Sequence, residues 1–467
     1  MCVFVIGLSR LNKDPAAANY EGNMVSNQLR SRDRLRLGIL ICIHVIFCCV
    51  SLTYVATHKL PQMADPATFH IFYQPSGVYL AVIVVATFAL FIPLFVFARF
   101  SFGYFVGFYF YTMVLGYLWL ACFSDLDYGR PLAQFSAAAS AIAFLLPALF
   151  IVSPVAQTYV LSVTAFERLL AFIFLLGVVT VLISSTYSFQ FVSIDDIYKF
   201  RGKVESPAIL RYLVGISSAL LPFAFAGFVA RRAFWRASAV LVLLVFFYAI
   251  TFSKLALFTP CWLVAMLVLS KLADARSVVI LSLLAPILAG VLLFSLFPEH
   301  AASYFFIVNF RMVAIPSVAL DIYNDYFAKH ELTYFCQISA ITRFMDCPYQ
   351  DQLSVVMHEA YRLGYFNASL FATEGIASVG TLYAPVATFA CGLVIALGNR
   401  FSAGLPPRFI LLSGAIIPHV LLDVPLTTAM LTHGVGLIFL LWYTTPRTIF
   451  EFNTAQVAAP VKRSMVD

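Results

Sequence analysis

The stretch 308–334, "VNFRMVAIPSVALDIYNDYFAKHELTY", is the segment on which the membrane topology of the chain depends. Its first half is apolar enough to lie in lipid, but Arg311 stands in the middle of it. A transmembrane helix over 304–320 would put that arginine at mid-depth, at a cost of about 2.5–3.5 kcal/mol. We therefore expect a helix that lies at one membrane surface or dips into the membrane from it, and the sequence leaves these two arrangements open.

The composition identifies the class of protein around this stretch. Of the 467 residues 62% are hydrophobic and only 11% are charged, whereas soluble domains carry about 25% charged residues. Backbone polar groups in lipid must be satisfied within the chain, which favours helices. We predict an all-α polytopic integral membrane protein. Its net charge of +7 is then a signal of orientation and not of a nucleic-acid partner.

About twelve segments are apolar over the roughly 20 residues that a transmembrane helix needs. They lie at 37–56, 77–98, 100–123, 134–156, 169–192, 212–230, 237–253, 255–270, 277–297, 381–399, 409–424 and 427–445. The last two are short, and "HVLLDVPLTT" between them indicates a tight turn. Residues 1–36 and 447–467 are predicted tails, and the first 23 residues look like an unstructured extension. "VFVIGL" near the start is too short for a secretory signal.

Basic residues predict the orientation of these spans. With the N-terminal tail inside, 18 of the 29 Lys and Arg fall on the inside, and 15 of the 22 acidic residues fall outside. The short connections "RRAFWR" and "KLADAR" are basic, as cytoplasmic turns should be. We therefore expect both termini in the cytoplasm and two outer loops, at 193–211 and at 298–380. The second loop contains the opening stretch and is long enough to be functional.

Arginines on the outer side are the first candidate site residues, because outer loops are usually poor in Lys and Arg. The set comprises Arg201, Lys203, Arg211, Arg311, Arg343 and Arg362. Arginine binds phosphate and carboxylate in a bidentate manner, so several of them at a membrane surface suit a lipid-linked diphosphate. Each one taken singly is better explained by contact with lipid headgroups or by pairing with nearby acidic residues.

Aromatic residues of the opening stretch recur at helical spacing, so they share one face. They are Tyr323, Tyr326, Phe327, His330 and Tyr334. Asp325 lies four residues before Lys329, the spacing of an ordinary helical ion pair. Such an aromatic face beside carboxylates can bind sugar rings. An interfacial belt of tyrosines explains it equally well.

The segment 355–380, "VVMHEAYRLGYFNASLFATEGIASVG", offers polar side chains before the tenth span. A general base must be titratable and within reach of the attacking hydroxyl. His358 and Glu359 qualify by type, although neighbours on a helix point apart, and Asn367 and Glu374 are further polar candidates. The alternative is a solvated loop helix.

Two of the nine cysteines, Cys336 and Cys347, lie in the long outer loop. In an oxidising compartment they would close a short loop, and a disulfide and two free thiols are equally compatible with the sequence. Most of the others stand in apolar stretches. No CxxC motif or Cys/His ligand spacing is present, so we expect no metal and no cofactor.

Ionisable residues are sparse within the predicted spans. Asp423 and His433 lie near the last hairpin, and we find no internal repeat. Ion-coupled transporters usually have both buried charges and repeats. The sequence therefore disfavours an ion-driven carrier.

The layout resembles the bacterial oligosaccharide repeat-unit polymerases of the Wzy type, which are related to O-antigen ligases. An apolar multispan half leads to an outer loop with "DDIYKFRGK" and "LRYL", then to a basic turn and a span pair joined by "FSK". The long outer loop opens with "FRMVAIPSVALDIYNDYF" and closes with "FNASLFATEGIASVG". The resemblance covers about residues 100–445 and rests on order and layout.

This resemblance implies a metal-independent glycosyltransferase of the bacterial cytoplasmic membrane. It would pass a glycan from undecaprenyl diphosphate to the hydroxyl of a new lipid-linked repeat unit, forming O-antigen or exopolysaccharide. Arg311, then Arg201 or Arg211, would bind the diphosphate, and His358 or Glu359 would act as base. Tyr323, Asp325, Tyr326 and Asn367 would bind glycan. A chain-length regulator and a flippase would be partners. A ligase and a non-enzymatic lipid-linked saccharide transporter are the alternatives.

Overall fold

The computed structural model describes residues 15–58, 66–192, 206–338, 341–364, 366 and 373–450, with side chains for all of these except 15–30, 66 and 67. Within them the fold is all-α, and one isolated β-bridge joins Ile71 to Ser124. Eleven helical segments of the described part of the chain are long and apolar enough to cross a membrane. The prediction of an all-α polytopic membrane protein is confirmed.

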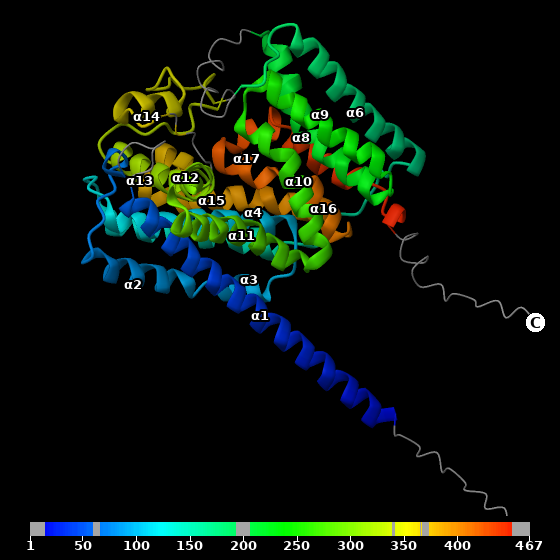
Figure 1. Ribbon diagram of the computed structural model, residues 1–467. Coiled ribbons are helices and arrows are strands. Elements are labelled where there is room, and N and C mark those ends of the chain that lie inside the picture. Colours follow the sequence, from blue (N-terminus) through cyan, green and yellow to red (C-terminus); the bar gives the residue numbers. More distant parts are fainter. Residues whose placement is uncertain are drawn as a thin grey trace, which may run out of the picture.

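The first nine of these segments follow the predicted spans (Figure 1). They are α1 (Pro15–Thr57), α2 (Gly77–Ala89) with α3 (Ile92–Phe97), α4 (Phe102–Leu120), α5 (Arg130–Phe150), α6 (Val163–Ser185), α8 (Ala208–Ala230), α9 (Phe234–Thr251), α10 (Lys254–Leu272) and α11 (Ala275–Leu296). The tenth is 298–327, in three parts described below, and the eleventh is α15 (Gly375–Ser402).

Helix α4 forms the centre of the bundle, and all of its residues are buried. Its sequence "FGYFVGFYFYTMVLGYLWL" is apolar or aromatic on every side, which is typical of a helix surrounded by others. Glycine allows the closest approach: a Cβ on Gly103 would lie 2.1 Å from the carbonyl oxygen of Ala148 on α5. Likewise a Cβ on Gly392 of α15 would lie 2.6 Å from the carbonyl oxygen of Phe144. Helices α4, α5 and α15 therefore form a tightly packed group.

One end of the bundle, here called the basic end, gathers arginines from separate turns. Arg276 donates to the carbonyl of Ala98, and Arg400 donates to the carbonyl of Ser153 at 3.2 Å. The same end of the bundle also carries Arg34 of α1, Arg99 between α3 and α4, Arg231 after α8 and Arg447 after α19. The opposite end, here called the cap end, carries α14 (Leu353–Tyr361) and the loops around it (Figure 1).

The segment 298–327 is one continuous helical run: α12 (Pro298–Phe305), the π-helix η3 (Phe306–Ala314) and α13 (Ile315–Phe327). Near its start the Phe305 ring stacks 4.6 Å from Phe294 at the cap end of α11. Further along, Asn309 donates to the carbonyl of Ile287, about halfway down α11. Near its finish Asp321 accepts from Tyr128, in the turn after α4.

Both ends of this run therefore lie at the cap end, and its middle reaches about half the depth of the bundle. Val308, Asn309 and Phe310 are buried, which does not fit a helix lying flat on a surface. The geometry favours the other predicted arrangement, a helix that dips in from one side. The run is long enough to cross a membrane, but its contacts bring it back to the end where it starts.

The predicted tail at 15–36 continues α1, so residues 15–23 are helical and not unstructured, and the first part of α1 projects from the bundle in Figure 1. Two predicted spans are wrong. The spans 409–424 and 427–445 are not continuous helices. The chain forms α16 (Pro407–Ser413), α17 (Ile417–Asp423), α18 (Leu426–Leu431) and α19 (Val435–Thr444). Pro418 and Pro425 lack an N–H for helix continuation, and Gly434 has a φ of 73°.

Helix α15 bends sharply where the predicted outer loop ends. Gly380 has φ 79° and ψ 164°, a conformation that side chains disfavour and glycine allows. Residues 375–379 fold back beside the following helix, so that a Cβ on Gly375 would lie 3.2 Å from the Cβ of Ala387. The end of the predicted loop therefore enters the bundle.

Candidate functional site

Asp325 anchors helix α14 on α13 at the cap end. The Tyr361 hydroxyl of α14 donates to Asp325 Oδ2 at 2.6 Å, and Lys329 Nζ lies 2.6 Å from Oδ1. The carboxylate is 5% exposed, and both of its oxygens are occupied. Burial, together with the Asp325 carboxylate, raises the pKa of Tyr361, so this hydroxyl keeps its proton and remains a donor. The predicted pair of Asp325 and Lys329 is confirmed.

Asp321, one helical turn earlier, is held by residues that the sequence did not single out. The hydroxyl of Tyr128 donates to Asp321 Oδ1, and the Tyr117 hydroxyl lies 3.1 Å from that of Tyr128. Arg130 closes the same turn by donating to the carbonyl of Ser124 at 2.8 Å. Nothing in "SDLDYGRP" distinguishes Tyr128 from an interfacial tyrosine, because its partner lies 193 residues away.

The aromatic residues of α13 are divided between the interior and the surface. Tyr323 is fully buried and donates to the carbonyl of Phe366 at 3.3 Å. Tyr326 is half-buried, and its ring stacks 3.9 Å from that of exposed His330. Tyr334, outside the helix, is 59% exposed. A sugar ring can therefore reach the edge formed by Tyr326 and His330, whereas the ring of Tyr323 is enclosed.

Glu374 is a buried carboxylate just before the fold-back segment 375–379. It is 5% exposed, and its Oε2 has no hydrogen-bond partner in the structure. Its charge acts on Tyr323 of α13 and on Cys391, well inside α15. Burying a carboxylate oxygen without a donor is costly. A side chain kept in this position points to a function.

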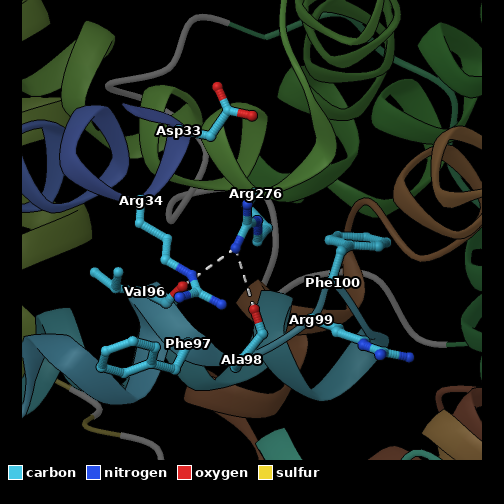
Figure 2. A pocket seen from close by; sticks show the side chains of 8 residues that line it. All are labelled: Asp33, Arg34, Val96, Phe97, Ala98, Arg99, Phe100 and Arg276. Carbon is cyan, nitrogen blue, oxygen red and sulfur yellow. Dashed lines mark hydrogen bonds between the residues drawn. The ribbon is translucent and has the colours of Figure 1, made fainter. Parts of the chain in front are cut away.

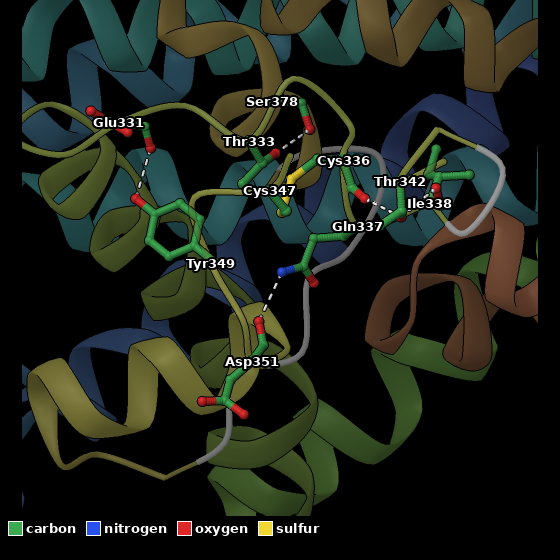
Figure 3. The surroundings of a disulfide bond; sticks show 10 residues. All are labelled: Glu331, Thr333, Cys336, Gln337, Ile338, Thr342, Cys347, Tyr349, Asp351 and Ser378. Carbon is green, nitrogen blue, oxygen red and sulfur yellow. Dashed lines mark hydrogen bonds between the residues drawn. A yellow bond between two sulfur atoms is a disulfide. The ribbon is translucent and has the colours of Figure 1, made fainter. Parts of the chain in front are cut away.

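The loop after α13 is closed by a disulfide between Cys336 and Cys347 (Figure 3). The loop is also tied to the fold-back segment, because the Thr333 and Tyr334 amides donate to the carbonyls of Ala377 and Ser378 at 2.8 and 3.1 Å. The structure thus forms the bond that the sequence left open, and it places a braced loop over the segment that carries Glu374.

Arg311 lies on the π-helical part of the dipping helix. It is half-buried, and its guanidinium lies 5.4 Å from the centroid of the Phe306 ring. Its positive charge acts on Asp423, the last residue of α17, immediately before a helix break. π-helical turns are rare and are frequent at functional sites. An arginine, a carboxylate and two irregular helices therefore meet inside the bundle.

The predicted site residues do not all meet at one point. Arg311 and Asp325 are 14 residues apart on one helical run, which is about 20 Å along its axis. Arg211 is exposed in the first turn of α8, Glu359 is exposed on α14, and His358 is half-buried there. Arg201 and Asn367 lie outside the described residues.

Within the side chains that the structure describes, no group of three or more His, Cys, Asp or Glu is placed to hold a metal ion. The fold defines a polytopic all-α membrane protein with ionisable groups inside its bundle. No family model, no curated protein and no solved structure matches the chain.

Proposed function

We propose that the protein is a repeat-unit polymerase of the bacterial cytoplasmic membrane, with the basic end in the cytoplasm and the cap end outside. Its substrates would be oligosaccharides linked to undecaprenyl diphosphate. The observation that carries the proposal is Arg311, a guanidinium held inside the bundle on the π-helical segment of a helix that dips from the cap end. Ionisable residues at such depth are costly and mark substrate sites.

In the proposed reaction, the bond between the anomeric carbon of the donor glycan and its diphosphate oxygen breaks. A new bond forms from that carbon to the acceptor hydroxyl oxygen of a second lipid-linked unit. The diphosphate leaves as an anion, and a fixed guanidinium stabilises its developing charge. Asp423 balances the charge of Arg311 while no substrate is bound. The lipid tail lies between helices, so the diphosphate stays at the depth of Arg311.

The acceptor hydroxyl transfers its proton to a base. His358 and Glu359 are the sequence-based predictions for this role, and the burial of Glu374 supports it as a third candidate. A carboxylate oxygen without a donor can accept a proton, and Glu374 Oε2 is such an atom. The edge formed by Tyr326 and His330 provides stacking for the glycan.

The gene deletion tests this function, with analysis of both surface polysaccharide and lipid-linked intermediates. A polymerase predicts single repeat units on the carrier and no long chains. A chain-length regulator and a flippase would then act in the same pathway. Long chains that remain on the carrier would indicate a ligase, and normal chains would overturn both.

Complementation with variants tests the site. Arg311→Ala should reproduce the deletion phenotype. Because Arg311→Ala removes the positive charge that acts on Asp423, the double variant Arg311→Ala/Asp423→Asn restores the balance of charge. The double variant should reach normal protein level and still lack polymerisation. Arg236→Ala, at an exposed arginine of the basic end, is the matched control and should polymerise normally. A double variant that polymerises would refute the role of Arg311.

One observation favours a lipid-linked saccharide transporter as the second candidate. The pairs α16–α17 and α18–α19 are interrupted helices, and transporters bind substrates at such breaks. Purified protein in liposomes separates the two functions. A polymerase lengthens lipid-linked glycans without moving them across the bilayer, whereas a transporter moves them without lengthening them.

A further inference from the structure

A groove at the basic end is formed by three separate parts of the chain. It is lined by Asp33, Arg34, Val96, Phe97, Ala98, Arg99, Phe100 and Arg276, and it encloses about 410 Å³. These residues come from α1, from the end of α3 and its connection to α4, and from the first turn of α11. None of them belongs to the cap-end clusters. The groove is therefore a second and independent feature of the bundle.

Three of the eight lining residues are arginines, and Figure 2 shows Arg34 and Arg276 approaching the same space from two helices. Arg276 is fixed there because its Nη1 donates to the carbonyls of Val96 and Ala98, both at 3.3 Å. Its Nε lies 3.9 Å from Asp274, and its other side-chain nitrogen remains for a ligand. Arg276 thus forms a rigid wall of the groove.

Arg34 is held by a different contact. Its guanidinium lies 5.2 Å from the centroid of the Phe97 ring, which fixes the plane of the group and leaves its N–H donors free to bind a ligand. Among the described side chains, no ion pair involves Arg34 or Arg99. Like charges held close together repel, so an anion between them is favourable. Asp33 supplies one carboxylate at the rim.

The position of the groove indicates the source of the anion. It lies where membrane-spanning helices end, and Phe97, on its wall, is 62% exposed on the side of α3. Arginines at such a place meet the phosphates of lipid headgroups, and basic pockets between helix ends select anionic lipids. Guanidinium groups fit phosphate oxygens in pairs. A free phosphate would use the same donors but not the apolar wall.

We propose that this groove binds the phosphate headgroup of an anionic glycerophospholipid, with Arg34 and Arg276 on the phosphate and Phe97 beside the acyl chains. Bound there, the lipid joins α1 to α11 at the basic end. The proposal does not depend on the function of the cap end.

Thermal unfolding of the purified full chain in neutral detergent tests this site. Phosphatidylglycerol is titrated as the probe, with phosphatidylcholine and inorganic phosphate in parallel. The test variant is Arg34→Gln/Arg99→Gln, which spares the backbone contacts of Arg276. The matched control is Arg232→Gln/Arg236→Gln, which removes two exposed arginines at the same end outside the groove.

Phosphatidylglycerol should give a saturable rise in Tm that phosphatidylcholine does not give. The apparent affinity should fall at least tenfold in Arg34→Gln/Arg99→Gln and remain unchanged in the control. Equal losses in both double variants would show a general charge effect and overturn the site. An equal stabilisation by inorganic phosphate alone would overturn the lipid assignment, as would the absence of saturation.

Discussion

Tyr361 donates a hydrogen bond of 2.6 Å to Asp325, and this contact joins α14 to the end of the dipping helix. The two residues are 36 positions apart. Because the Asp325 carboxylate is buried, its oxygens need donors, and Tyr361 and Lys329 provide them. Helix α14 is therefore held to the bundle by hydrogen bonding to a buried carboxylate and not only by apolar packing.

Tyr361→Phe should weaken the attachment of α14 to the dipping helix. The phenyl ring keeps the packing but leaves one oxygen of a buried carboxylate without a donor, which costs about 1.5–3 kcal/mol. We expect a lower Tm and faster proteolysis around α14. Tyr334→Phe, at an exposed tyrosine, is the control and should leave both unchanged. Equal protease resistance in the two variants would contradict the anchoring role of Tyr361.

The disulfide between Cys336 and Cys347 should be present in protein from its native membrane. Peptide mapping without reduction should recover the linked pair. Cys336→Ser/Cys347→Ser should lower the free energy of unfolding by about 3 kcal/mol, because the unfolded chain gains conformational freedom when the loop is no longer closed. The loss of stability should be largest near 331–347. Cys261→Ser, at an exposed free cysteine, should have no such effect. Recovery of both thiols in free form would contradict the prediction.

Gly116→Ala should displace the dipping helix from α4. A Cβ at this position would lie 2.2 Å from Ser317 Oγ and 3.3 Å from its Cβ. Overpacking of this kind typically costs about 1–3 kcal/mol. The double variant Gly116→Ala/Ser317→Ala removes the colliding oxygen and should recover much of the lost Tm. If the double variant is less stable than Gly116→Ala alone, the close packing of these helices is not the cause.

Glu374→Gln should separate stability from activity. The amide has nearly the same shape, and burying it costs less than burying a carboxylate, so Tm should not fall. If Glu374 accepts the proton of the acceptor hydroxyl, glycan transfer should decrease at least 100-fold. Measurement of lipid-linked chain length over time checks this, with exposed Glu331→Gln as the control. Full activity in Glu374→Gln would return the role of base to His358 or Glu359.

Ten of the predicted spans are present because each depends on a local property, a long apolar run that must be helical in lipid. The two that failed contain Pro418 and Gly434, and Pro425 lies between them; these residues interrupt the helices in a way that mean hydropathy does not register. Arg311 and Asp325 were recognisable as unusual from their neighbours along the chain. Tyr128, Tyr361 and Asp423 were not recognisable as partners, since each meets a residue far away in the sequence.

The sequence by itself determined the class of protein, the helical nature of its spans and the segregation of arginines to one end, because hydropathy and charge act locally on each segment. Only the tertiary structure decided that 298–327 returns to the end where it begins and that 375–379 folds back beside the rest of α15, after Gly380. It also decided that Glu374 is buried near Tyr323 and that Arg311 acts on Asp423. These relationships depend on which helices pack together. Close contacts between helices, such as Gly116 with Ser317 and Gly290 with Asn309, determine that packing.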